Sequence, residues 1–116
     1  MHKKVREFND YRQKMNDKII ASDNKIIKRI FNLDTKAFKK EYLPLKTKEL
    51  LGLVASAVLR CDNCVQYHLE SSYKLAFSKK EMMETMSIAN LIGGTIMIPH
   101  LRKALEYWGS LEESDL

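Results

Sequence analysis

The sequence predicts an all-α protein, a single-domain bundle of about six helices that assembles into oligomers. Apolar residues recur at spacings of three and four in most segments, and no stretch alternates apolar and polar residues over the length of a strand. The 116 residues, 45% of them hydrophobic, suffice for one core but not for two domains. We expect one domain over residues 1–116, with N-terminal helices in 1–43 and a motif-bearing core in 44–108.

The N-terminal part reads as three helices separated by capping residues. The first runs from Lys3 to Ala21, with apolar residues at helical spacing: Val5, Phe8, Tyr11, Met15 and Ile19. Residues 22–24 (Ser-Asp-Asn) interrupt it, and a second helix covers residues 25–31. Asp34 and Thr35 would then cap a further short helix that reaches Tyr42 and ends before Pro44.

The central part contains the clearest helix signals. Residues 46–60 carry a broad apolar face, in which Gly52 and neighbouring small residues permit close packing against another helix. A second central helix is expected from about Asp62 to Ala76. The Ser-x-x-Glu pattern that begins at Ser78 is a capping box, which predicts a new helix from Lys79.

Residues 85–99 contain no charged side chain and are apolar around the whole helix circumference. They are too few to span a membrane, which takes about 18–20 apolar residues. We therefore expect this helix to be buried, in part by another subunit. A last helix should run from Pro99 to Trp108, followed by an acidic tail at 110–116 that frays.

Charge is distributed unevenly along the chain, whose net charge is +5. Residues 1–48 contain 14 Lys/Arg and 6 Asp/Glu, whereas residues 49–116 contain 6 and 9. The lysines alternate with apolar residues at helical spacing and lack interleaved aromatics, so we expect solvated helix faces and neither nucleic acid nor membrane as a partner. The charged start, with no apolar run after it, and the cysteine usage described next predict a cytoplasmic protein.

Both cysteines lie in a C-x-x-C motif, Cys61 and Cys64, followed by His68. If a helix begins at Asp62, Cys64 and His68 are i,i+4 neighbours on one face, and Cys61 fits the cap position, where the backbone can bring the sulfurs together. A first-turn position or a nearby imidazolium lowers the pKa of a thiol. Such a dithiol can attack a peroxide or disulfide with one sulfur and resolve the product with the other.

Other interpretations of these residues remain open. The cysteines could be inert packing residues, and His68 a plain surface residue. The C-x-x-C pair and His68 could also bind zinc, with His100 or Glu49 as a fourth ligand, although no second C-x-x-C or H-x-x-x-H pattern accompanies them. A zinc-binding or non-catalytic oligomeric scaffold is therefore the alternative to a redox enzyme.

Glu49, twelve positions before Cys61, together with the C-x-x-C pair and His68, resembles the alkyl hydroperoxidase D-like, or carboxymuconolactone decarboxylase, family over about residues 44–105. The resemblance implies an all-helical homo-oligomer, commonly a trimer or hexamer, with peroxidase or related thiol–disulfide activity in antioxidant defence. It implies a lipoyl or other dithiol reductant. We expect a hydroperoxide as substrate and neither a cofactor nor a metal. By motif match, Cys64 would attack, Cys61 would resolve, and Glu49 and His68 would relay protons.

Two features limit this transfer of roles. Peroxidase members have a second histidine between the cysteines, where this chain has Asn63, so we expect a weaker or different proton relay. Decarboxylase members lack the cysteine pair, which disfavours decarboxylase activity for this chain. In a straight helical hairpin that turns near Cys61, Glu49 would lie about 18 Å from the turn along the helix axis, and His68 only about 10 Å from it. Contact between them requires crossed helices, a long reach or a neighbouring subunit; otherwise Glu49 is a solvated carboxylate in the first turn of a helix.

Overall fold

The computed structural model describes residues 2–114, which contain six α-helices and one short 3-10 helix. The elements are α1 (Lys3–Ala21), α2 (Lys25–Ala37), α3 (Leu45–Val58), α4 (Asp62–Lys74), α5 (Lys79–Gly93), η1 (Thr95–Met97) and α6 (Ile98–Glu112). No strand occurs between residues 2 and 114. The predicted all-α class is confirmed.

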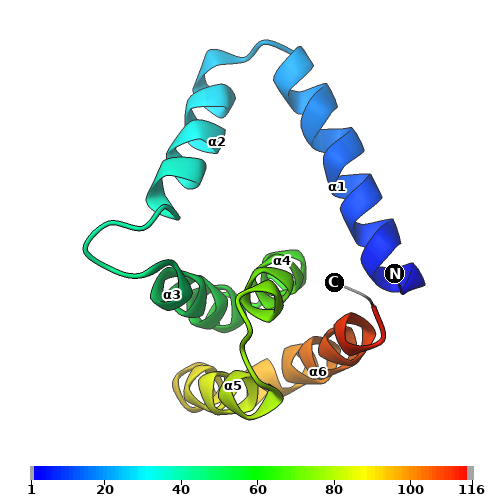
Figure 1. Ribbon diagram of the computed structural model, residues 1–116, viewed down its shortest axis with the longest axis vertical. Coiled ribbons are helices and arrows are strands. Elements are labelled where there is room, and N and C mark those ends of the chain that lie inside the picture. The colour runs from blue at the N-terminus through cyan, green and yellow to red at the C-terminus, as the bar shows by residue number, and fades with distance from the viewer. Residues whose placement is uncertain (1, 115–116) are drawn as a thin grey trace.

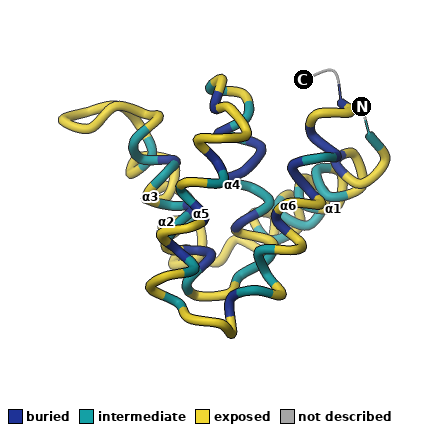
Figure 2. Tube along the Cα trace, turned by 90° about the horizontal axis from the view of Figure 1, so that it is seen from below, coloured by how far each residue is buried: buried dark blue, intermediate teal, exposed yellow. Residues whose placement is uncertain are grey.

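Helices α3 to α6 pack against one another, while α1 and α2 form two arms of a wide angle beside them (Figure 1). The two ends of the chain are tied together, because the His2 backbone N–H donates to Ser114 Oγ at 2.7 Å and Lys4 Nζ to Glu106 Oε1 at 2.6 Å. Buried positions concentrate in α3 to α6, and α2 has none (Figure 2). Helix α4 has both buried and exposed residues, and the cysteine motif at its start lies at the edge of this core.

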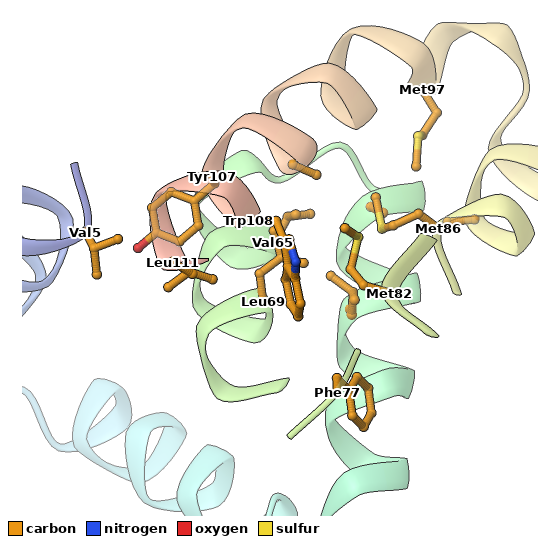
Figure 3. Close-up of a cluster of buried hydrophobic side chains, with 14 residues drawn as sticks. Val5, Val65, Leu69, Phe77, Met82, Met86, Met97, Tyr107, Trp108 and Leu111 are labelled. Atoms are coloured by element: carbon orange, nitrogen blue, oxygen red, sulfur yellow. The ribbon is translucent and has the colours of Figure 1, made fainter. Parts of the chain in front are cut away.

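The core is built around Trp108 of α6, which is 1% exposed and lies beside Val65 and Leu69 of α4 (Figure 3). The Tyr73 ring meets the Trp108 ring edge to face at 5.2 Å between centroids. Three buried methionines extend the cluster toward α5 and η1: Met82, Met86 and Met97. Unbranched methionine side chains fill irregular gaps between helices, and these three do so here.

Helix starts follow the capping residues of the sequence. Asn24 Oδ1 accepts from the Ile27 N–H at 3.0 Å and begins α2. At α5, Ser78 Oγ accepts from the Glu81 N–H at 3.0 Å while Glu81 Oε1 accepts from the Ser78 N–H at 2.9 Å, so the predicted capping box is complete.

The separate short helix expected after Asp34 is wrong, because α2 continues through Asp34 and Thr35 to Ala37. Thr35 Oγ1 donates to the Phe31 carbonyl at 3.1 Å, a bond back to the preceding turn that a threonine inside a helix can make. The hydroxyl therefore serves the existing helix instead of capping a new one. Residues 38–44 form the turn and loop into α3.

Within one chain the uncharged stretch is only partly buried, since Leu91 is 83% exposed and the helix ends at Gly93, before Gly94 with φ 77°. Its expected burial by another subunit stays a prediction. One expectation for the C-terminal part is corrected. The tail does not fray at residue 110, because Leu111 lies one turn after Trp108 on the same face and is fully buried. Residues 115 and 116 of that tail lie outside the described residues. None of the helices within 2–114 is long and apolar enough to cross a bilayer.

Candidate redox site

The two cysteines lie at a tight turn between α3 and α4. Arg60 adopts a left-handed conformation, with φ 60°, and its N–H donates to the Ala57 carbonyl, while the Cys61 N–H donates to the Ser56 carbonyl, each at 3.0 Å. This pair of bonds is a Schellman ending of α3. Cys61 is at once the residue that closes α3 and the N-cap of α4, so the C-x-x-C motif has a fixed position at the start of α4.

Cys61 and Cys64 are joined by a disulfide, with their Cα atoms 5.2 Å apart, within the ordinary range. Cys61 Sγ also accepts from the Cys64 N–H at 3.3 Å, as predicted for a cysteine at the cap. Cys64 is exposed, whereas Cys61 is only half-exposed. Cys64 is therefore the cysteine more open to another molecule, and both cysteines lie where the partial positive charge of the helix start favours a thiolate.

One turn further along α4, His68 meets Glu49 of α3. His68 Nδ1 donates to Glu49 Oε2 at 2.8 Å, and the two residues are 9% and 5% exposed. The crossing of α3 and α4 brings them together inside one chain, so no neighbouring subunit is needed. The alternatives of a solvated Glu49 and of a surface His68 are wrong. Because Nδ1 is held by the carboxylate, Nε2 is the ring atom left to exchange a proton.

Gly52 and Phe38 also shape the histidine site, and sequence reasoning did not assign them to it. A β-carbon at Gly52 would lie 2.6 Å from His68 Cε1, so only glycine leaves room for the ring against α3. The Phe38 ring, from the turn after α2, lies 5.2 Å from the imidazole between centroids, and the Tyr67 ring lies 5.3 Å from it. In the sequence, a glycine inside an otherwise apolar helix was a signal that another group packs closely at Gly52. Nothing in the sequence indicated that Phe38 lies beside His68.

A second histidine approaches the cysteine motif from α6. His100 Nδ1 lies 2.7 Å from Asp62 Oδ1, and Lys103 Nζ donates to Asp62 Oδ2 at 3.1 Å. Burial by itself would raise the pKa of Asp62, but the hydrogen bonds and charges of His100 and Lys103 outweigh it and hold the pKa below its usual value. His100 is thus engaged with the residue that follows Cys61.

Within residues 2–114, no three side chains of His, Cys, Asp or Glu are gathered as a metal site. Of the ligands considered for zinc, Glu49 is paired with His68 and His100 with Asp62.

Comparison with known proteins connects this arrangement to one family. The model of the carboxymuconolactone decarboxylase family matches residues 25–107. Two crystal structures of a Thermotoga maritima protein are each 43% identical to this chain over 92% of it. They have TM-scores of 0.90 and 0.88 and are covered over 94% and 91% of their own lengths, respectively. The second is described as a carboxymuconolactone decarboxylase family protein with a suggested part in the antioxidative response.

A more distant relative supports the fold alone. A carboxymuconolactone decarboxylase family protein of Legionella pneumophila, solved in its apo form, is 23% identical, with a TM-score of 0.83 over 93% of this chain and 96% of its own. No curated protein matches the sequence.

Proposed function

The chain belongs to the carboxymuconolactone decarboxylase family, and we propose that it is a thiol-dependent peroxidase or disulfide oxidoreductase that serves antioxidant defence. The observation that carries the proposal is the exposed Cys64, bonded to Cys61 at a helix start, one turn before a buried histidine–carboxylate pair. The antioxidative role suggested for the Thermotoga maritima relative agrees with this chemistry.

The oxidising half of the proposed cycle consumes a hydroperoxide. The Cys64 thiolate attacks the peroxide, a sulfur–oxygen bond forms, and the O–O bond breaks. The departing alkoxide takes a proton from His68, so the products are an alcohol and a sulfenic acid on Cys64. Cys61 then attacks the Cys64 sulfur, hydroxide leaves with the Cys61 proton as water, and the disulfide forms. Glu49 orients His68 by its hydrogen bond to Nδ1.

The reducing half requires two electrons from outside the chain. An external dithiol, of the lipoyl type or similar, attacks the disulfide and leaves as its own disulfide, while Cys61 and Cys64 return to thiols. The same step run against a protein disulfide would make the chain a disulfide oxidoreductase. We propose a cytoplasmic setting, where such dithiols keep the pair reduced between cycles.

The test begins with the fully reduced protein and one equivalent of hydroperoxide near neutral pH. We expect the intact mass to fall by two hydrogens within the mixing time of the assay, with a Cys61–Cys64 bridge found by peptide mapping. If both thiols stay free and react slowly, the proposal fails and the chain is a non-catalytic member of the family.

Serine variants separate the roles of the two cysteines. Cys64→Ser should abolish peroxide consumption, because the attacking sulfur is lost. Cys61→Ser should leave a sulfenic acid on Cys64, trapped by dimedone, or a mixed disulfide with an added thiol. Turnover retained in both variants would contradict the assignment.

A further inference from the structure

A second imidazole–carboxylate pair lies at the C-x-x-C motif, formed by His100 and Asp62 at 2.7 Å. Asp62 is the first residue of α4 and directly follows Cys61. Lys103, one turn beyond His100 on α6, binds the other carboxylate oxygen at 3.1 Å. The side chains of His100 and Asp62 are 22% and 28% exposed, so the pair is largely shielded from water.

A carboxylate beside a cysteine disfavours the thiolate, and a neighbouring cation favours it. In this cluster the charge of Lys103 offsets that of Asp62. Histidine changes its charge between about pH 5 and 8. With neutral His100 the three side chains therefore sum to about zero, and with protonated His100 to about +1.

The other charged groups around Asp62 compensate one another. Asp62 and Lys103 border a cavity of about 580 Å³, to which α1 contributes Lys4 and Glu7 and α6 contributes Glu106. Lys4 pairs with Glu106 at 2.6 Å. Arg60 precedes Cys61 and carries a constant positive charge near neutral pH. On α4, His68 is bonded to Glu49 on the α3 side.

We propose that His100, acting through Asp62, is a positioning residue that keeps the Cys61–Cys64 pair reactive as the pH falls below neutral. This inference rests on the proposed function, which assigns redox chemistry to the Cys61–Cys64 pair. During reduction an incoming thiolate attacks the exposed Cys64 sulfur, and a mixed disulfide forms as the S–S bond breaks. Cys61, the residue directly before Asp62, leaves with the electron pair as a thiolate, which the added positive charge of His100 stabilises. The second thiol of the external dithiol then displaces Cys64 and completes the two-electron reduction.

The test compares wild type with His100→Gln, whose amide can still donate to Asp62 but does not titrate. The reduced proteins are alkylated with iodoacetamide, which reacts with thiolates, and each cysteine is followed by peptide mapping. We expect the alkylation rate of wild type to exceed that of His100→Gln by about three- to tenfold near pH 6. Near pH 8 the ratio of the two rates should approach one. A purely structural role would change the rate by the same factor at every pH, and that result, or equal rates throughout, overturns the proposal.

A second variant keeps the test decisive if His100→Gln does not fold, as judged by circular dichroism. Asp62→Asn removes the negative charge but keeps an oxygen that can accept from His100 and Lys103. We expect its alkylation to be about two- to fivefold faster than that of wild type near pH 7. An unchanged or slower rate overturns the proposal.

The matched control is His2→Gln, which removes a histidine that contacts Glu113 at 3.1 Å at the start of the chain. Its rate should equal that of wild type at every pH. If this variant instead shows the pH-dependent ratio expected of His100→Gln, the proposal is overturned. Alkylation needs no peroxide turnover, so failure here is distinguishable from failure of the peroxidase proposal.

Discussion

At the scale of single residues, the missing side chain of Gly52 decides where His68 can lie. The imidazole occupies the space in which a β-carbon would stand, at 2.6 Å from Cε1 and 2.9 Å from Nε2. The ring is also fixed by Glu49 at 2.8 Å and by the Phe38 ring at 5.2 Å between centroids. Moving the imidazole away from α3 therefore costs at least one of these contacts.

Replacing Gly52 with alanine should displace the His68 ring and weaken its bond to Glu49. We expect the free energy of unfolding to fall by about 1–3 kcal/mol, because overpacking forces side chains from their preferred positions. Peroxide consumption should fall by at least about tenfold, because the proton donor is misplaced. Urea denaturation and a peroxide assay measure the two effects.

The matched control is Gly109→Ala in α6, where an added β-carbon meets nothing within 4 Å. Because alanine favours a helix over glycine, this variant should be more stable by up to about 1 kcal/mol, with unchanged activity. A Gly52→Ala protein that behaved like Gly109→Ala would contradict the placement of His68 against α3.

At the scale of elements, the turn between α4 and α5 repeats the construction of the turn that carries the cysteines. Ala76 has φ 65°, its N–H donates to the Tyr73 carbonyl at 3.0 Å, and the Phe77 N–H donates to the Ser72 carbonyl at 3.1 Å. Phe77, the residue after Ala76, is 4% exposed. In both turns a residue other than glycine holds the left-handed position, which is unfavourable for a side chain with a β-carbon.

Ala76→Gly should therefore stabilise the protein by about 0.5–1 kcal/mol, the relief of left-handed strain less the added freedom of the unfolded chain. The same chemical change at Ala55, an exposed position inside α3, should destabilise it by about 1 kcal/mol. Urea denaturation of both variants measures the difference in sign. Equal losses of stability would show that Ala76 is not strained in solution.

Local signals in the sequence predicted most helix starts but not the contacts that complete the site. The Ser78 capping box and the Cys61 cap could be predicted because both depend on neighbouring residues. The continuity of α2 through Asp34 could not, since the same side chains can cap a helix or bond within it. The Glu49–His68 contact was predictable only as one of several geometries, because it depends on how two helices cross. The His100–Asp62 contact joins residues 38 positions apart, and nothing local indicates it.

At the scale of the whole molecule, residues 2–114 of a single chain leave two apolar surfaces uncovered. One lies on the second half of α5 and on η1, where four residues are 51–83% exposed: Ile88, Leu91, Ile92 and Ile96. The other lies on α2, where three residues are 56–65% exposed: Ile26, Ile30 and Leu33. Contiguous apolar surface of this kind is typical of sites where proteins associate.

We therefore propose that the chain forms a homo-oligomer, a trimer or hexamer, in which the α5 surface is buried between subunits. Replacing both Leu91 and Ile92 with glutamate should place unpaired charges in that interface and lower the mass measured by sedimentation velocity to that of a single chain. Lys80→Glu, an exposed charge change at the start of the same helix, should leave the mass of the assembly unchanged. Because Cys61, Cys64, Glu49 and His68 come from one chain, the dissociated variant should still form the disulfide with one equivalent of hydroperoxide. Loss of that reaction on dissociation would show that a neighbouring subunit completes the site, and a wild-type protein that sediments as a single chain would contradict the assembly.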